Sequence, residues 1–381
     1  MAIQEGEGAA GVRDVDTLII GAGQAGLATA HALERRGGDC LVVDAERRVG
    51  DNWRHQYDSL SLYTPNRFNA LPGMPFPGDP RGFAHKDEAA AYLEAYAAHL
   101  ERPVQLDCRV HRLARHGDWF RAETAQGVID CRSVVVATSP LGRAPAIPAA
   151  AAELDPAILQ LHSSEYRRPN QLREGPVLVV GGGHSGCDIA LELARTHPTT
   201  LAGRDPGQVP VPWDKPIVHL AVPMVMAMYR WVHVRRAPHG RRLREHVLHH
   251  GAPMLRVKRA HLAEAGVTRT TARMVGARDG QPLLADGTVV EAASVVWATG
   301  FRHEFGWLDL PVLDAEGWPR EYRGVAADVD GLYFCGLAWQ HSMASMVIFG
   351  AGSDAAHVAR RILARSAVPA RRPRPAAAGA R

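Results

Sequence analysis

Two copies of one hydrophobic pattern organise the chain: a short apolar run, a glycine-rich turn, and then apolar residues at helical spacing. The first copy begins with TLII at residues 17–20 and continues through GAGQAG; the second begins with VLVV at residues 177–180 and continues through GGGHSG. The segments that follow, Leu27 to Arg36 and Cys187 to Thr196, have the periodicity of amphipathic helices, and each leads to another apolar run. The repeat predicts two strand, turn, helix and strand units of one kind.

Further apolar runs at residues 133–138 and 294–300 have the character of chain crossings between the two units, and residues 331–336 and 351–364 that of a last strand and helix. We expect an α/β protein with two Rossmann-like dinucleotide-binding domains of the three-layer ββα type, the second inserted into the first. The expected boundaries are a disordered start at 1–15, a first domain at 16–155 and 293–365, an inserted domain at 156–292, and a disordered tail at 366–381.

The composition is that of a globular protein, with 46% hydrophobic and 22% charged residues. The 44 basic and 40 acidic residues mostly interleave and leave a net charge of +4, which is a poor electrostatic footprint for nucleic acid. The five cysteines stand far apart, without a CxxC pair or a metal-ligand spacing. We therefore expect no nucleic-acid partner, no metal site and a reducing, cytoplasmic setting.

The longest uncharged apolar stretch runs from Pro216 to Tyr229. It is shorter than the roughly 20 residues that cross a bilayer, so we expect a buried helix and no stable membrane insertion. A shallow membrane contact for a lipophilic substrate stays open as an alternative.

The glycine motifs predict two bound dinucleotides, because each has the full strand, turn and helix context. The first glycine permits a tight turn, the second lets a pyrophosphate approach the backbone, and the third lets helix and strand pack closely. The pyrophosphate then lies at the positive end of the helix. The expected contact residues are Gly21, Gly23, Gln24, Ala25 and Gly26 in the first motif, and Gly181, Gly183, His184, Ser185 and Gly186 in the second.

The end of the second strand distinguishes the two nucleotides. Equal counts from the first glycine of each motif reach Asp44 and Arg204. A carboxylate accepts hydrogen bonds from a free ribose diol and repels a 2′-phosphate, whereas an arginine attracts that phosphate. The first site therefore suits FAD or NAD, and the second suits NADP(H).

Several segments in order along the chain resemble the class B flavin-dependent monooxygenases, close to the YUCCA-type and bacterial flavin-containing enzymes. They are GDNWR at residues 50–54, residues 60–65, LPGMPFP at 71–77 and ATG at 298–300. The resemblance implies FAD at the first motif and NADPH at the second. The further cofactor contacts that it implies are Asn52, Trp53, Tyr63, Thr64, Val110, Thr138, Thr299 and Gly300.

The chain also departs from this family's pattern. The family's linker signature is kept only from His162 onward, since Pro156 and Ile158 stand where Phe and Gly are expected, which weakens an assignment as a Baeyer-Villiger enzyme. Ser139 replaces a usual glycine, and Tyr63 stands where animal-type members have an asparagine beside the flavin.

The implied function is insertion of one oxygen atom from O2 into a small organic substrate through a C4a-(hydro)peroxyflavin, by N- or S-oxygenation or by oxidation of a ketone or 2-oxo acid. The candidate catalytic residues are Tyr63, near the flavin, and Gln340, on the substrate side after the last strand. Substrate selectivity is expected in residues 209–267, whose methionines and aromatics suit either an apolar pocket or an ordinary core. An NADPH oxidase or flavin reductase, a non-catalytic NADPH sensor and a homodimer all stay open.

Overall fold

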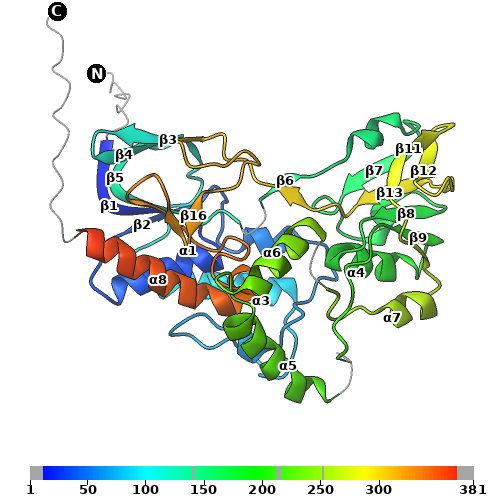
Figure 1. Ribbon diagram of the computed structural model, residues 1–381, viewed down its shortest axis with the longest axis horizontal. Coiled ribbons are helices and arrows are strands. Elements are labelled where there is room, and N and C mark those ends of the chain that lie inside the picture. The colour runs from blue at the N-terminus through cyan, green and yellow to red at the C-terminus, as the bar shows by residue number, and fades with distance from the viewer. Residues whose placement is uncertain (1–11, 140–141, 212–215, 251–252, 367–381) are drawn as a thin grey trace, which may run out of the picture.

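The computed structural model describes residues 12–139, 142–211, 216–250 and 253–366. Figure 1 shows two α/β lobes, with a narrow connection between them. The first and last helices of the described residues belong to one lobe, and the middle of the chain forms the other. The expected α/β class, with one Rossmann-like domain inserted into another, is confirmed.

The first domain contains a sheet of nine strands among the described residues. They are β1 (Val12–Ile20), β2 (Leu41–Val43), β3 (Val110–His116), β4 (Trp119–Thr124), β5 (Gly127–Val136), β15 (Leu308–Asp309), β16 (Glu321–Tyr322), β17 (Val325–Ala326) and β18 (Leu332–Phe334). Its helices are α1 (Gln24–Glu34), α2 (Asp51–Arg54), α3 (Lys86–Ala98) and α8 (Ile348–Ser366).

The long strand β5 joins the two sheet layers of this domain. Along one edge it pairs in parallel with β1, from Val12 opposite Val128 to Ile20 opposite Val136. Along the other edge, its first half pairs antiparallel with β4 and its last residues pair in parallel with β18. One strand therefore serves both an antiparallel meander and a parallel sheet.

Side chains alternate between two cores because successive residues of a strand point to opposite faces. Ile19 and Val135 pack against the layer formed by α1, α3 and α8. Their neighbours Leu18 and Val134 pack against the meander, where they meet Phe120. Both faces of the parallel strands are covered, which explains why their sequences are continuously apolar rather than alternating.

The second domain repeats this arrangement on a five-stranded parallel sheet in the order β10-β9-β8-β13-β7. These strands are β7 (Leu159–His162), β8 (Val177–Val180), β9 (Thr199–Ala202), β10 (Thr268–Thr270) and β13 (Ser294–Trp297). Helices α4 (His184–Leu193) and α7 (Arg259–Glu264) contribute to the core on one face. The hairpin of β11 (Met274–Arg278) and β12 (Gln281–Leu284) contributes to the core on the other.

Two expected boundaries differ from the structure. Strand β13 pairs with both β7 and β8, so the inserted domain extends to Trp297 and does not stop at residue 292. Strand β1 begins at Val12, inside the segment expected to be disordered. Residues 1–11 and 367–381, which make up most of the two expected disordered ends, lie outside the described part.

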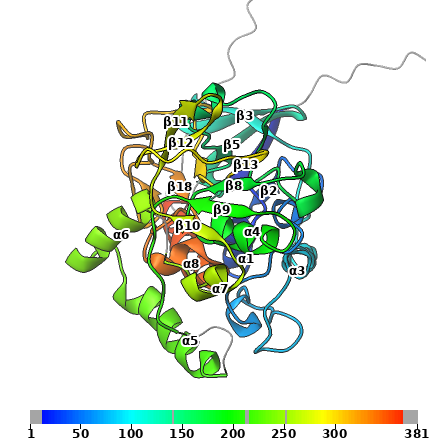
Figure 2. The ribbon, with the colours of Figure 1, turned by 90° about the vertical axis from the view of Figure 1, so that its right-hand side faces the viewer.

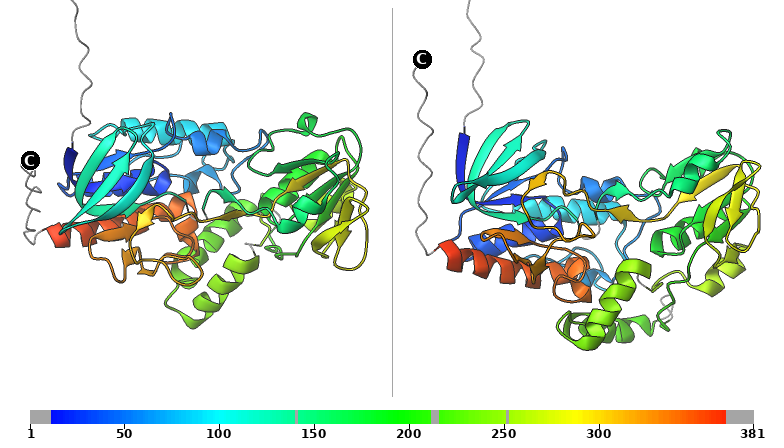
Figure 3. Two further views of the ribbon diagram at one scale, coloured as in Figure 1. Left: turned by 90° about the horizontal axis from the view of Figure 1, so that it is seen from above. Right: turned by 45° about the horizontal axis from the view of Figure 1, so that its top comes forward.

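The two passages between the domains form a short antiparallel ribbon. Strand β6 (Ala144–Pro145) pairs with β14 (Phe301–Arg302), and Figure 3 shows this crossing from two further directions. A side chain at Gly142 would overlap the backbone of Arg302, so the two passages touch directly. The crossings were expected in the runs 133–138 and 294–300, but these runs lie mainly in β5 and β13 of the two sheets, and the ribbon comes after them in the chain.

Residues 216–250 form an arm of two helices, α5 (Val218–Ala227) and α6 (Pro238–His250), joined through a π-helical turn at Met228–Val232. Figure 2 shows both helices projecting away from the two sheets. One face of α5 packs on Trp339 and Met343 of the first domain. The opposite face is exposed, so the expectation of a buried helix holds for only one side of α5.

The third glycine of each motif is a packing requirement. A Cβ on Gly26 would overlap the carbonyl oxygen of Gly21, and a Cβ on Gly186 would overlap that of Gly181. By contrast, a Cβ on Gly23 or Gly183 would meet nothing within 4 Å.

We therefore expect Gly26→Ala and Gly186→Ala to lower the free energy of unfolding by roughly 1–3 kcal/mol or more, because helix and strand must separate. Gly183→Ala is the matched control and should change stability by less than about 1 kcal/mol. Urea unfolding followed by circular dichroism measures both. Equal stability of all three variants would contradict this account of the turns.

Candidate functional site

A large cavity of about 450 Å³ opens at the carboxyl ends of β1, β2 and β5. The predicted contact residues that line it are Gly21, Gly23, Gln24, Ala25, Asp44, Asn52, Trp53, Val110 and Thr138. Gly26 does not line it, because it packs beneath the turn. The structure thus brings together residues that are more than 100 positions apart in sequence, and it does so at the edge where parallel α/β sheets bind ligands.

The helix that faces the cavity begins in a form suited to an anion. Gly23 is the N-cap of α1, and neither a side-chain cap nor an acidic residue occupies the first turn. The first amide groups of a helix have no partners within the helix and carry the positive end of its dipole. A phosphate or pyrophosphate can accept hydrogen bonds from them without displacing a protein side chain.

Asp44 stabilises the first glycine-rich turn by hydrogen bonds. Its carboxylate accepts hydrogen bonds from the amide of Ala22 at 2.5 Å and from the amide of Glu46 at 2.8 Å. Each oxygen keeps a further lone pair, because a carboxylate has about four acceptor sites. Asp44 can therefore hold the glycine turn against the end of β2 and still accept a ribose hydroxyl.

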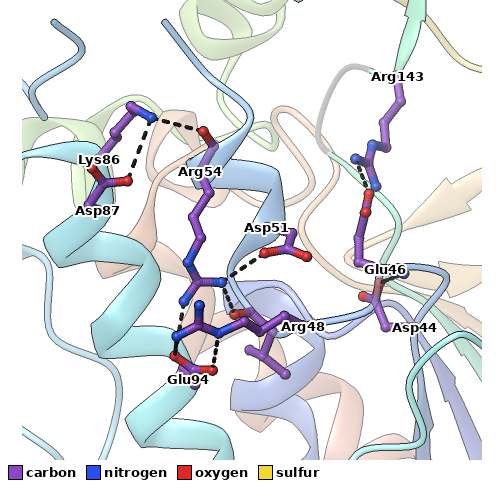
Figure 4. Close-up of polar contacts among 10 residues, drawn as sticks. Asp44, Glu46, Arg48, Asp51, Arg54, Lys86, Asp87, Glu94 and Arg143 are labelled. Atoms are coloured by element: carbon purple, nitrogen blue, oxygen red, sulfur yellow. Dashed lines mark hydrogen bonds and ion pairs between the residues drawn. The ribbon is translucent and has the colours of Figure 1, made fainter. Parts of the chain in front are cut away.

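An ion-pair network fixes the segment that carries Asn52 and Trp53. The Arg48 guanidinium donates to both oxygens of Glu94 on α3, at 2.5 and 2.8 Å (Figure 4). Arg54 donates to Glu94 at 2.9 Å and to Asp51 at 2.9 Å. Helix α2 is thereby tied to α3 by several charge-assisted hydrogen bonds, which are stronger than neutral ones.

Two further polar contacts support the cavity wall. Lys86, which does not line the cavity itself, donates to the carbonyl of Arg54 at 2.8 Å, and Arg143 pairs with Glu46 at 2.6 Å, both of which line it (Figure 4). The Nε1 group of Trp53 is buried and has no hydrogen-bond partner among the described residues. An unpaired buried donor beside a cavity is the mark of a ligand that completes it.

Several lining residues were not singled out from the sequence: Glu46, Arg48, Asp51, Cys108, Arg109, Arg143, Cys335, Gly336 and residues 303–307. One of them carried a usable signal. Gly336 directly follows the last strand, has φ of 89°, and lies so close to Ala25 that a side chain would collide with it. A glycine at the end of a predicted strand indicates such a close approach.

The second motif repeats the first turn, including its contact with a neighbouring strand. A side chain on Gly21 would overlap the carbonyl of Ala137, and one on Gly181 would overlap that of Ala298. Helix α4 begins at N-cap Gly183, again without a side-chain cap or an acidic first turn. Ser185 is exposed in that turn, where its hydroxyl is available to a ligand.

The register at the end of the second strand corrects the sequence count. The amides of Gly21 and Gly181 donate to Val43 and Ala202, both at 2.8 Å, so these two acceptors are equivalent. The residue equivalent to Asp44 is therefore Gly203, and Arg204 is the next one. The count was wrong by one residue because the second connection from helix to strand is shorter.

The end of β9 is nevertheless positively charged. Arg204 is exposed directly after Gly203. The neighbouring carboxylate of Asp205 pairs with Arg259 at 2.7 Å and with Arg269 at 2.6 Å. Three arginines against one aspartate, with no carboxylate at Gly203, favour a phosphate here.

Thr299 and Gly300 lie under the second turn rather than in the large cavity. The hydroxyl of Thr299 is buried without a partner among the described residues. The imidazole of His162 contacts the carbonyl of Gly300 at 3.0 Å and the hydroxyl of Ser164 at 2.8 Å. His162 thus positions the start of the ribbon.

Tyr63 bridges the two domains. Its ring meets the ring of His184 edge to face, with 5.1 Å between the centroids. Burial lowers the pKa of His184 and raises the pKa of Tyr63, so both are neutral near pH 7. Thr64 is buried and its hydroxyl donates to Asn69 within the same loop. Tyr63 and Thr64 lie outside the residues that line the large cavity.

Gln340 was predicted to face the substrate, but the structure buries it to 1% exposure. Its carbonyl accepts a hydrogen bond from the amide of Leu337 at 3.3 Å, and its amide nitrogen lies against Gly324. The turn that begins at Gly336 directs this side chain inward. Gln340 is therefore enclosed by the protein, and its amide nitrogen, like the Nε1 group of Trp53, is buried without a hydrogen-bond partner among the described residues.

A second cavity of about 440 Å³ lies where α4 faces the first domain. Its lining includes Ser59, Ser61 and Phe83 from the first domain, and Asp188, Glu192 and Arg256 from the second. Asp188 accepts a hydrogen bond from the hydroxyl of Tyr57 at 3.0 Å and pairs with Arg256 at 3.2 Å. This cavity contacts both domains beside the second turn.

No disulfide or metal centre is formed by the described residues. All five cysteines are free and buried, and burial raises the pKa of the Cys335 thiol, which lines the large cavity, to about 12. Among the described residues, no group of three or more His, Cys, Asp or Glu side chains could hold a metal ion. The same part of the chain contains no helix that is both long and apolar enough to cross a membrane.

Comparison with known proteins agrees with this geometry. Residues 18–216, more than half of the chain, match the pyridine nucleotide-disulphide oxidoreductase family. An uncharacterised CzcO-like oxidoreductase of Geobacillus kaustophilus is 37% identical over 92% of this chain and 98% of its own length. Indole-3-pyruvate monooxygenase YUCCA1 of Oryza sativa is 36% identical over 47% of this chain and 45% of its own length.

A solved structure extends the likeness to nearly the whole fold. The flavin-containing monooxygenase of Stenotrophomonas maltophilia has a TM-score of 0.71 and 26% sequence identity, over 93% of this chain and 99% of that one. At this coverage the likeness extends over both domains of this chain. The chain therefore belongs to the pyridine nucleotide-disulphide oxidoreductase family and is, within it, a class B flavin-dependent monooxygenase.

Proposed function

We propose that this enzyme uses FAD and NADPH to insert one oxygen atom of O2 into a small organic substrate, by N- or S-oxygenation or by oxidation of a ketone or 2-oxo acid. FAD occupies the large cavity and NADPH the second turn. The observation that carries the proposal is the contrast between two otherwise equivalent turns. Asp44 braces the first, whereas Gly203 and an arginine-rich strand end follow the second.

The cavity fits FAD by the chemistry of its wall. The uncapped start of α1 suits a pyrophosphate, and Asp44 suits a ribose diol. Val110 lies at the same end as Asp44, where its backbone can meet an adenine. The unpaired Nε1 of Trp53, which also lines the cavity, can donate to a flavin or ribityl oxygen.

The second turn suits NADPH for parallel reasons. The uncapped start of α4 binds the pyrophosphate, and Arg204 attracts the 2′-phosphate. Neutral His184 and Tyr63 lie between this turn and the first domain, which makes Tyr63 our candidate for the residue beside the nicotinamide. Thr299 and Gly300 support the turn from below.

When bound, the flavin supplies the reduction of O2 and the transfer of one oxygen atom. The protein's part is to hold the two cofactors together and to exclude water. The ion pairs of Arg48 and Arg54 with Glu94 keep the Asn52 and Trp53 segment against the cofactor. The half-buried pair of Tyr63 and His184 forms a contact between the two domains.

Two other activities share these cofactors. An oxidase would pass electrons to O2 without oxygen insertion, and a sensor would bind NADPH without turnover. Thiol chemistry is disfavoured, because the five cysteines are unpaired and the Cys335 thiol stays protonated. We propose only the chemical class of the substrate: a small amine, thioether, ketone or 2-oxo acid.

Gly23→Ala should leave the fold intact and weaken FAD binding at least about tenfold, because the added methyl occupies the space of the pyrophosphate. Flavin content after purification and fluorescence titration with FAD measure the effect. Gly183→Ala is the reciprocal control: it should retain FAD and raise the KM for NADPH. If both variants lose FAD equally, or neither loses its own cofactor, the assignment of the two turns is wrong.

Arg204→Ala should raise the KM for NADPH by roughly 10- to 100-fold and leave the KM for NADH nearly unchanged, because a charge-assisted hydrogen bond to the 2′-phosphate is lost. Anaerobic flavin reduction with each nucleotide measures this split. Arg278→Ala, an exposed arginine in the same domain, should have no effect. Equal losses with NADPH and NADH would remove Arg204 from the phosphate site.

Rapid mixing of the NADPH-reduced enzyme with O2 tests the reaction class. We expect a transient absorbance distinct from oxidised and reduced flavin, which decays more slowly with NADP+ present because the bound nucleotide excludes water. Direct reoxidation with stoichiometric hydrogen peroxide would support the oxidase. Failure of NADPH to reduce the bound flavin would support the sensor.

A further inference from the structure

The outer face of α5 and of the turn after it carries a continuous apolar stripe. It consists of Ile217, Leu220, Met224, Met228, Trp231 and Val232, all of which are exposed. Leu220 is 79%, Met224 71% and Trp231 68% exposed. The spacing of three and four residues places them along one side of a helix. Large apolar side chains gathered in this way indicate an interaction surface.

The stripe faces solvent because the opposite face of α5 packs on the first domain. Val222 and Met226 are buried against Trp339 of the first domain. Pro223 cannot donate a hydrogen bond to the carbonyl of His219, four residues earlier, and Arg67 donates to that carbonyl instead at 2.7 Å. The apolar stripe therefore faces outward as a consequence of packing.

The segment that carries the stripe is positively charged. Residues 216–250 contain six arginines and one acidic residue, Glu245. Arg236, Arg241 and Arg242 are exposed. Arg230 lies over the ring of Trp231, with its guanidinium carbon 5.0 Å from the ring centroid. The remaining two are engaged elsewhere, since Arg235 pairs with Glu321 and Arg244 lies over Trp318.

The position of the arm leaves the stripe accessible to a partner. In Figures 1 and 2, α5 lies at the lower edge of the molecule, and Figure 2 shows α6 above it, projecting to one side. The stripe is therefore accessible to a flat partner, and no helix among the described residues is long and apolar enough to cross a membrane.

We propose that α5 and the turn after it dock this protein on the surface of an anionic lipid bilayer. The apolar stripe enters the boundary between headgroups and acyl chains, with Trp231 at the interface, and the flanking arginines meet the lipid phosphates. A second copy of the chain is the weaker partner, because it would bring the same excess of arginines to the interface with only one carboxylate, that of Glu245, in each arm. The inference does not rest on the proposed function.

The test uses the flavin-loaded full chain and flotation with large unilamellar vesicles. Vesicles of phosphatidylcholine with phosphatidylglycerol should bind the protein at least tenfold more strongly than vesicles of phosphatidylcholine alone. The double variant Leu220→Glu, Met224→Glu should bind at least tenfold more weakly than wild type. Arg241→Glu with Arg242→Glu should remove the preference for the anionic lipid.

Two control variants introduce glutamate in the same way at exposed positions outside the arm. Val275 on β11 is 54% exposed, so Val275→Glu alters an exposed apolar residue outside the arm. Arg273→Glu with Arg278→Glu reverses two exposed charges in the same hairpin region. Both controls should bind vesicles like wild type. Flavin absorbance and the unfolding midpoint verify that every variant is folded.

A second measurement avoids charged substitutions. Brominated lipids should quench part of the tryptophan fluorescence of the wild type, and Trp231→Phe should remove that quenching. The proposal is overturned if wild type fails to bind anionic vesicles, or if the stripe variant binds as well as wild type. It is also overturned if light scattering shows a dimer that the stripe variant converts to monomers, because a second copy then covers the stripe.

Discussion

The contact between the third glycine and the carbonyl of the first glycine governs both halves of this molecule. It lets α1 and α4 start directly at the ends of β1 and β8, with no room for even a methyl group between helix and turn. Their free amide groups are thereby directed at one place. The proposed binding of a dinucleotide at each turn depends on this steric condition, which is satisfied twice.

The same turns are also held from the side. Gly21 lies against Ala137 after β5, and Gly181 lies against Ala298 after β13. In both domains the residue that follows this alanine is a threonine, so the internal repeat extends beyond the glycine motifs to the strand beside them. A crossing strand and a cofactor turn are thus built as one unit, and the ribbon of β6 and β14 starts directly from it.

The sequence predicted those features that depend on residues close together in the chain. The glycine motifs, the helices after them and the apolar strands were all recoverable, because tight turns and periodic burial leave a signature within about ten residues. Pairing partners leave none, so the apolar run of β13 was assigned to the wrong side of a domain boundary. The one-residue difference that separates Arg204 from the position of Asp44 likewise appears only in the hydrogen bonds of the sheet.

Residues brought in from distant parts of the chain were the hardest to foresee. Residues 303–307 and Arg143 line the first cavity only because the ribbon returns the chain there. Gln340 has the polarity of a binding residue, yet the turn at Gly336 directs it into the interior. An apolar run such as 217–232 is compatible with either core or surface, since hydrophobicity does not reveal which face meets a partner.

The position of β18 constrains how the protein is made. Val134 of β5 pairs with Leu332, so the sheet beside the large cavity stays incomplete until residue 332 has left the ribosome. The inserted domain, whose strands all lie between residues 159 and 297, is synthesised complete before that. Domains generally fold as units, and the first to begin here is therefore the last to close. During synthesis, the edge of β5 that awaits β18 is an open sheet edge, with the exposure to mispairing that such edges carry.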